Sequence, residues 1–262
     1  MTYEKFVETE IFEKLDMNNS FYDHPEEIVK NNILGYDKDS LGFKRADFMT
    51  MCAPFSAGGL RSNIHDLAIW NQAIHKGQLI SIENLARAFA PFKLNSGELS
   101  NYGFGWSSDS FLGHQLYHHN EGIFGFTKEG FYFPEEDIYI AVLSNNTSVD
   151  MEYLNFLISA IILEKEITES VKIDTNKINE YKGTYEYDNM TLLIESDSTG
   201  LSMNAQGQKE NMKTNGINEF YIDGTNISCV FNQDVNGIAE SITVKHRFFG
   251  DEWFTAVKSL GK

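Results

Sequence analysis

Residues 102–144 read YGFGWSSDSFLGHQLYHHNEGIFGFTKEGFYFPEEDIYIAVLS and carry the clearest strand signals in the chain. Short segments rich in aromatic and β-branched residues predict four strands here. These are Tyr102–Ser107, Gln115–His119, Phe124–Phe133 and Ile138–Ser144. The turn-forming residues 134–137 separate the last two. We therefore expect an antiparallel sheet in this part of the chain.

Helical periodicity lies on both sides of the predicted sheet. Apolar residues between Tyr3 and Ile11 follow helical spacing, with Thr2 placed as the N-cap. A second helix is predicted over Ile64–Ile74. Residues Met151–Ile162 form the wide apolar stripe of a helix that lies on a sheet. Residues 18–50 contain few sequence signals for helices or strands.

The sequence pattern changes again after residue 168, where short strand candidates alternate with Gly- and Asn-containing turns. The candidates are Thr184–Tyr187, Thr191–Glu195, Phe220–Ile222, Ile227–Phe231, Ile242–Lys245 and Trp253–Val257. This spacing favours a small antiparallel barrel or sandwich. The sequence thus predicts an α+β chain with a helix-and-sheet domain over residues 1–168 and an all-β domain over residues 169–262.

Composition excludes several classes of function. The chain has 262 residues, 38 acidic against 21 basic side chains, and a formal charge of −17. Such a charge disfavours nucleic acid as a partner. The two cysteines, Cys52 and Cys229, form neither a disulfide framework nor a metal cluster. No apolar run reaches membrane-spanning length, and no motif calls for a cofactor.

A glycine pair marks a candidate site. Residues 53–62 read APFSAGGLRS, and Gly58-Gly59 permits a turn that side chains would block, as in a loop that borders a site. An ordinary loop before the second helix is the alternative. Asp66-Leu67-Ala68 follows within that helix.

Several motifs in order carry a resemblance. They are Ala57-Gly58-Gly59-Leu60, Asp66-Leu67-Ala68, Tyr102-Gly103-Phe104-Gly105-Trp106, His119-Asn120-Glu121-Gly122, Gly125-Phe126, Pro134-Glu135 and Leu143-Ser144-Asn145. Together they resemble the serine hydrolases of the β-lactamase and penicillin-binding-protein superfamily, in the branch of class C β-lactamases, D-alanyl-D-alanine peptidases and esterases. The resemblance covers residues 1 to about 165. The segment around Tyr181–Tyr185 is similar to the lipocalin-like barrel often appended to this family.

The resemblance implies acyl transfer by a serine with a lysine one helical turn later. His119 matches the histidine of the family's His-x-Gly strand, and Gly122 would supply an oxyanion-hole N–H. Gly58, Gly59, Glu121 and Phe124 would border the substrate. Glu121 departs from the family, which has glycine at this position, and its side chain is expected to crowd the substrate edge.

The Ser-x-x-Lys motif of the family has no counterpart in a helical context here. The one match is Ser259-Leu260-Gly261-Lys262, at the terminus, and no Gly-x-Ser-x-Gly elbow occurs. In the family the motif lies upstream of the segment that resembles residues 1–17, so we expect Met1 to be an internal methionine of a longer ancestor. The sequence does not identify the cellular compartment, although family members are commonly periplasmic or extracellular.

Three functions remain under consideration. The first is the C-terminal part of a serine hydrolase, inactive by itself, which would take a small acyl, ester or peptide substrate once an upstream fragment completes it. Its bare sheet edge at Ile138–Ser144 would favour self-association. The second is a non-catalytic binding protein of the same fold. The third is hydrolysis at a rearranged site that uses Ser56 or His119. A zinc site at His114 and His118 lacks a third ligand, and no metal is expected.

Overall fold

The computed structural model of the chain describes residues 1–24, 28–30, 32–51, 53–165, 170, 177–197, 200–214, 216, 218–222, 224–250 and 252–259. They belong to two units, Met1–Ser159 and Ala160–Lys262. The predicted boundary between residues 168 and 169 lies outside the described residues.

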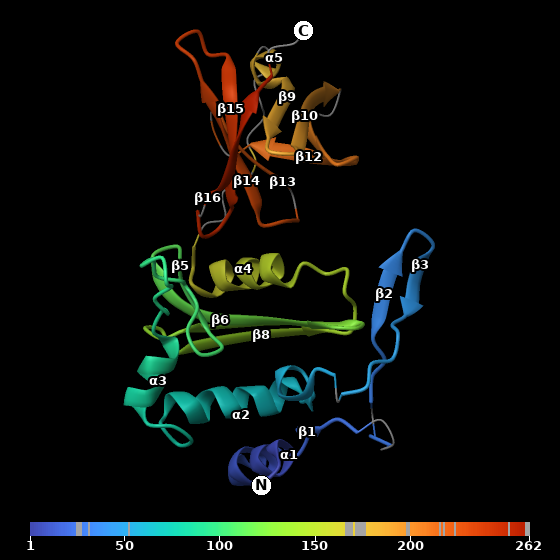
Figure 1. Cartoon of the computed structure of the whole chain (residues 1–262), viewed down its shortest axis with the longest axis vertical. Coiled ribbons are helices and arrows are strands. Elements are labelled where there is room, and N and C mark those ends of the chain that lie inside the picture. The colour runs from blue at the N-terminus through green and yellow to red at the C-terminus, as the bar shows by residue number, and fades with distance from the viewer. Residues whose placement is uncertain are drawn as a thin grey trace. The chain divides into compact units, whose positions relative to one another are not determined.

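The first unit contains a four-stranded antiparallel sheet with the order β5-β6-β7-β8 (Figure 1). Its strands are β5 (Ser107–Phe111), β6 (His114–Ile123), β7 (Phe126–Phe133) and β8 (Ile138–Ser144). Each strand follows its neighbour in sequence, so every connection is a hairpin. The predicted antiparallel sheet is therefore confirmed.

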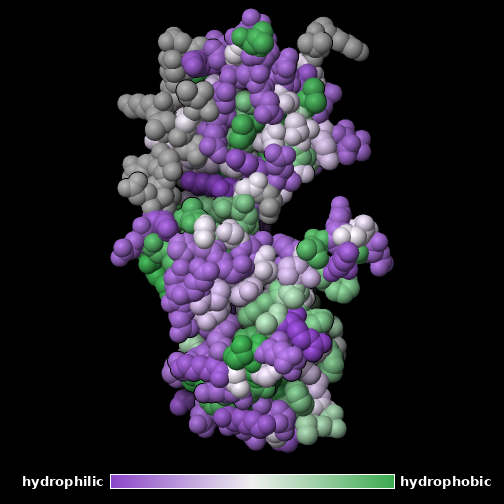
Figure 2. Space-filling model, turned by 90° about the vertical axis from the view of Figure 1, so that its left-hand side faces the viewer, coloured by the Kyte–Doolittle hydropathy of each residue, from purple (hydrophilic) through white to green (hydrophobic). Residues whose placement is uncertain are grey.

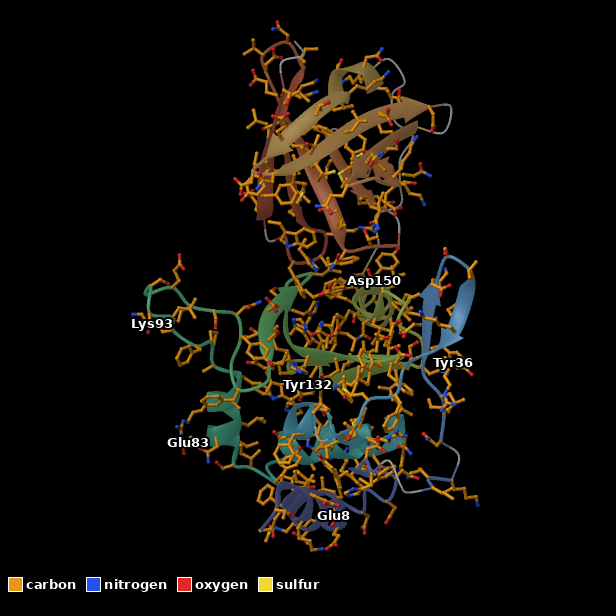
Figure 3. All side chains as sticks on the ribbon, turned by 45° about the vertical axis from the view of Figure 1, so that its right-hand side comes forward. Glu8, Tyr36, Glu83, Lys93, Tyr132 and Asp150 are labelled. Atoms are coloured by element: carbon orange, nitrogen blue, oxygen red, sulfur yellow. The ribbon has the colours of Figure 1, made fainter. Side chains whose placement is uncertain are left out.

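Helices cover both faces of this sheet. On one face, the fully buried ring of Phe156 in α4 (Met151–Ile162) packs against Phe111 and Phe131, with ring centroids 4.7 and 4.9 Å away. On the other face lies α2 (Ile64–His75), next to Tyr132 of β7 (Figure 3). The last residue of α2, His75, stacks on Tyr132 with ring centroids 3.5 Å apart. The alternation of side chains along each strand supplies both faces with apolar residues.

The N-terminal segment is helical, as predicted, but changes its pitch. The helix α1 (Tyr3–Val7) continues as a π-helical turn, η1 (Glu8–Phe12), and a 3₁₀ turn, η2 (Glu13–Leu15). The Thr2 hydroxyl accepts a hydrogen bond from the Lys5 N–H at 3.3 Å, which confirms the predicted N-cap. Val7, Phe12 and Met17 form a small core.

Asp66 fixes the start of α2. Its buried carboxylate accepts hydrogen bonds from the Asn19 backbone N–H and the Ser20 hydroxyl, both at 2.8 Å. The Asn63 side chain caps the helix by accepting from the Asp66 N–H at 2.9 Å. This aspartate therefore joins the helix to the segment that follows Met17, which is a structural role.

Some short elements were missed or misplaced by the sequence prediction. The missed elements are β1 (Phe21–Tyr22), β2 (Tyr36–Asp39), β3 (Gly42–Arg45), η3 (Phe55–Ala57), β4 (Leu60–Arg61) and α3 (Ile82–Phe89). The predicted strand Tyr102–Ser107 is wrong, because the chain turns at Gly105, whose φ is +84°, and the strand β5 begins at Ser107. Phe124 and Gly125 form a turn rather than the start of β7.

The second unit is a closed antiparallel barrel with the order β10-β11-β12-β13-β14-β15-β16-β9. Its elements are α5 (Ile178–Tyr181), β9 (Gly183–Tyr187), β10 (Met190–Asp197), β11 (Gly200–Ala205), β12 (Gln208–Thr214), β13 (Glu219–Ile222), β14 (Ile227–Gln233), β15 (Ala239–His246) and β16 (Glu252–Lys258). The barrel alternative is confirmed. The strand β11 and the mainly polar strand β12 were missed.

Side chains fill the barrel. Leu192, Ile242 and Phe231 are fully buried at its centre. Tyr185 is also fully buried, and its hydroxyl donates to the Tyr181 carbonyl at 2.6 Å, which fastens α5 to the barrel. The interior is thus a packed core.

Candidate functional site

The strand β6 is longer than its neighbour β5, and this difference leaves part of it unpaired. The pairing with β5 runs from Phe111↔His114 to Ser107↔His118 and then stops. The pairing with β7 continues to Ile123↔Phe126. Residues 119–123 therefore have β7 on one side and no described strand on the other.

Strand geometry shows which backbone groups face this open edge. The two-residue turn between Ile123 and Phe126 makes these residues a hydrogen-bonded pair, so the odd-numbered residues of β6 bond to β7. The N–H groups of Asn120 and Gly122 consequently point away from β7, toward the open edge. An unpaired N–H at this position is what a substrate carbonyl or an extended peptide would meet.

His119 lies between two polar side chains on the face of the sheet that α2 covers. Its Nδ1 is 3.2 Å from the Tyr102 hydroxyl, and its Nε2 is 2.9 Å from Glu121 Oε1. Glu121 thus turns along the strand toward His119, two residues away on the same face. We predicted His119 and Glu121 as site residues but did not assign Tyr102, although it begins the Tyr102–Trp106 motif.

A half-buried lysine lies across the strand pair from Glu121. Lys128 lies directly opposite Glu121 in the register of β6 and β7. The hydrogen bond from His119 lowers the pKa of Glu121, so this carboxylate is ionised at neutral pH. Burial lowers the pKa of Lys128, while Glu121 and Glu129 act in the opposite direction. The open edge therefore has one ionised carboxylate, that of Glu121, on the strand that forms it.

The glycine loop approaches the same end of β6. A Cβ placed on Gly58 would lie 3.9 Å from the Ile123 side chain, so this residue is close to Gly122. A Cβ on Gly59 would lie 2.6 Å from the Phe55 carbonyl oxygen and 2.7 Å from the Tyr22 ring, which explains the glycine. Phe124, half exposed, lies in the turn that follows Ile123.

Gly125 forms the other half of that turn. Its φ is +77°, and a Cβ there would lie 2.5 Å from the backbone carbon of Gly35. The Gly125 carbonyl accepts a hydrogen bond from the Tyr36 N–H at 3.2 Å. Close backbone contact therefore requires glycine at this position of the Gly-Phe motif.

The opposite face of β6 carries a buried ionic group. His118 Nε2 is 2.8 Å from Asp109 Oδ2 on β5, and His118 Nδ1 is 3.6 Å from Glu129 Oε1 on β7. Burial by itself lowers the pKa of His118, but the hydrogen bond to Asp109 and the carboxylate of Glu129 outweigh it and raise the pKa to about 9. The same burial raises the pKa of Glu129. His118 is therefore an imidazolium at neutral pH.

The remaining candidates lie apart from this arrangement. His114 bonds to Glu136, so His114 and His118 each have a carboxylate partner. In the part of the chain that the structure describes, no group of three or more His, Cys, Asp or Glu side chains is arranged to hold a metal. Ser56 lies in η3, and no hydrogen bond joins its hydroxyl to a described histidine. Cys52 and the last three residues of Ser259–Lys262 lie outside the described residues.

Comparisons with known proteins agree with this architecture. The sequence model of the family described as Beta-lactamase matches residues 1–161. No curated protein gives a significant match. Among the helices of the described residues, none is both long and apolar enough to span a membrane.

Three solved structures illustrate the likeness of fold. The octameric penicillin-binding protein homologue from Pyrococcus abyssi has a TM-score of 0.59 and 21% identity, over 98% of this chain and 60% of that chain. FmtA from Staphylococcus aureus has a TM-score of 0.53 and 16% identity, over 66% and 48%. D-amino acid amidase from Ochrobactrum anthropi SV3, complexed with L-phenylalanine amide, has a TM-score of 0.51 and 18% identity, over 62% and 52%.

This chain spans between about half and three fifths of the length of these structures. At such low identity the likeness shows the fold only. The family match is stronger, because it covers more than half of the chain and includes the open edge of β6, His119 and the glycine loop. The chain belongs to the β-lactamase family.

Proposed function

We propose that this chain forms one wall of the acyl-transfer site of a serine hydrolase, and that the 262 residues by themselves do not catalyse the reaction. The substrates would be small amides, esters or D-amino-acid peptides. The observation that carries the proposal is the open edge of β6, where the Gly122 N–H faces outward beside His119. The serine and its lysine would come from sequence outside these residues.

In this proposal each described group has a distinct role. The Gly122 N–H stabilises the oxyanion that develops on the substrate carbonyl. His119, held between Tyr102 and Glu121, positions a substrate polar group or assists proton transfer. The Gly58-Gly59 loop closes the end of the edge without side chains that would block it.

Labelling with an active-site probe tests the proposal. The purified chain should show no covalent labelling by a fluorescent penicillin or a fluorophosphonate. Mixing it with a separately made upstream fragment that contains Ser-x-x-Lys should produce labelling of the fragment, and the His119→Ala variant should reduce that labelling. Single-site labelling of the chain by itself, abolished by Ser56→Ala, would instead establish a rearranged site.

A second candidate, a non-catalytic binding protein, is supported by Glu121. The glutamate stands where the family has glycine, and its carboxylate lies beside the open edge. Under this alternative, a Glu121→Gly variant with the upstream fragment would be no more reactive than the parent chain. Under the first proposal, the smaller residue should raise the rate of labelling because it removes an anion from the edge.

The partner surface we propose is the outer edge of β8. This strand pairs with β7, and no described strand pairs along its other side. The backbone of Tyr36 forms hydrogen bonds just beyond the last residue of β8, with Asn145 and Thr147. We expect concentration-dependent association of the chain in sedimentation velocity, relieved by the upstream fragment. Replacing Val142 with lysine should weaken it, and monomeric behaviour of the parent at high concentration would contradict this proposal.

A further inference from the structure

A pocket of the first unit lies between α2, α3 and residues 104–106. Its volume is about 450 Å³, within the range of small-molecule sites. Trp70, Ile74, Leu85, Phe104 and Trp106 provide most of its lining. None of the residues that surround the open edge of β6 lines it, so it is a separate site.

Flat aromatic surfaces dominate the pocket. The indole rings of Trp70 and Trp106 are nearly parallel, at an interplanar angle of 5° with centroids 5.8 Å apart. Phe89 packs edge-on against Trp106 at 5.2 Å, which holds that indole in place. A planar aromatic group gains more contact with such walls than an aliphatic chain of equal volume.

The aromatic residues of the pocket are not fully buried. Phe104 is 73% exposed, and both tryptophans are only half buried. On the side of the first unit that carries α3, hydrophobic patches lie between hydrophilic residues (Figure 2). Adjacent exposed aromatic residues are typical of binding surfaces, because they contribute most to association when covered.

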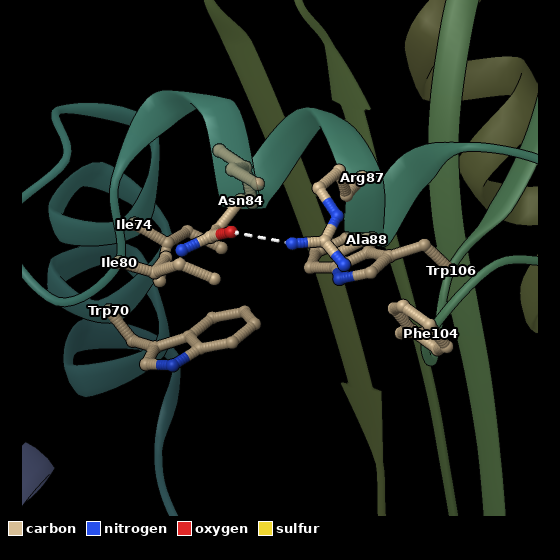
Figure 4. A pocket seen from close by; sticks show the side chains of 9 residues that line it. Trp70, Ile74, Ile80, Asn84, Arg87, Ala88, Phe104 and Trp106 are labelled. Atoms are coloured by element: carbon tan, nitrogen blue, oxygen red, sulfur yellow. Dashed lines mark hydrogen bonds between the residues drawn. The ribbon is translucent and has the colours of Figure 1, made fainter.

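One cation lies at the rim. The Arg87 guanidinium donates to Asn84 Oδ1 at 3.2 Å, and both side chains extend from α3 along the pocket (Figure 4). No described carboxylate forms an ion pair with Arg87, although the chain has 38 acidic residues. A guanidinium has five N–H donors, so most of its donor capacity is available to a bound anion.

We propose that this pocket binds a small aromatic carboxylate, with the ring against Trp70 and Trp106 and the carboxylate on Arg87. The positive charge of Arg87 selects for the carboxylate, and the indole rings of Trp70 and Trp106 select for the aromatic ring of the same ligand. The inference does not depend on catalysis at the open edge of β6.

Fluorescence of the intact chain tests the proposal with 2-naphthoate as the probe. Two of the three tryptophans line the pocket, and the third, Trp253, belongs to the second unit. Saturable quenching should persist in a Trp253→Phe variant. Arg87→Gln should weaken naphthoate binding by at least about tenfold, the size expected for a lost charge-assisted hydrogen bond.

Two controls make the result decisive. Arg45→Gln removes an exposed arginine from β3, far in sequence from the pocket, and should leave the affinity unchanged. The neutral analogue 2-naphthylmethanol should bind the parent and Arg87→Gln chains equally. Equal naphthoate affinity of the parent and Arg87→Gln chains, or quenching that is confined to Trp253, would overturn the proposal.

Discussion

The buried imidazolium of His118 should make the stability of the first unit depend on pH. His118 is 9% exposed and lies between Asp109 on β5 and Glu129 on β7, while Glu152 of α4 acts on Glu129 from the covering helix. The folded-state pKa of about 9 exceeds the ordinary value of 6.5. The folded state therefore keeps the proton over a pH range in which the unfolded chain has lost it.

Proton linkage gives the sign and the size of the change in the free energy of unfolding with pH. Below pH 6.5 both states hold the proton and the stabilisation is complete, whereas between pH 6.5 and 9 it is progressively lost. The difference of the two pKa values corresponds to about 3 kcal/mol in the free energy of unfolding. For a protein of ordinary stability this is a large fraction of the total.

Urea unfolding at pH 6.0, 7.5 and 9.5 measures this loss. In a Trp253→Phe background the fluorescence comes from Trp70 and Trp106, both in the first unit. His118→Gln should lower the free energy of unfolding at pH 6 and flatten its decline toward pH 9.5. Parallel pH profiles for the two proteins would refute the reasoning.

Three further outcomes are expected. Gly125→Ala should lower the melting temperature more than Gly113→Ala, because both glycines have positive φ but only at Gly125 would a Cβ meet backbone, at 2.5 Å; equal losses would contradict this. Asp66→Ala should cost about 2–4 kcal/mol, because Ser20 and a backbone N–H lose their buried acceptor; an unchanged urea midpoint would argue against it. Burial raises the pKa of the Cys229 thiol to about 12, so in a variant without the other cysteine a disulfide reagent at pH 8 should label it only after denaturation.

The sheet was predictable where its side chains alternate or cluster as strands require. The segments that became β7 and β8 are rich in aromatic and β-branched residues, and both were identified. The strand β5 was misplaced to Tyr102–Ser107 because Ser107–Ser110 is polar. Its pairing depends on the tight turn at Leu112 and Gly113, whose φ values are 51° and 86°.

The helix α3 was missed by the sequence prediction for a different reason. Ser81 precedes it, and its hydroxyl accepts a hydrogen bond from the Asn84 N–H at 3.3 Å, so a capping signal was present in the sequence. Eight residues give little periodicity to detect. The helix is held by contacts distant in sequence, among them the stacking of Phe89 on Tyr117 at 3.8 Å.

The candidate site was only partly accessible to sequence reasoning. Motif order placed His119, Gly122 and Gly58, and strand geometry then showed which way the Gly122 N–H faces. The contact between Tyr102 and His119 joins residues 17 apart through an irregular segment, which no local pattern encodes. The turn of Glu121 toward His119 depends on side-chain geometry that residue type does not specify.

The closure of the barrel brings its first and last strands together. β16 pairs with β9 through Lys258↔Tyr185, and the Ser259 N–H donates to the Thr184 carbonyl at 2.8 Å. The two points at which the chain enters and leaves these eight strands are therefore neighbours. A segment with adjacent ends can be relinked by a short connection, opened at another hairpin or transferred into a loop of a different protein without breaking a strand pair. The gene segment that encodes the barrel can therefore be moved between proteins as one unit.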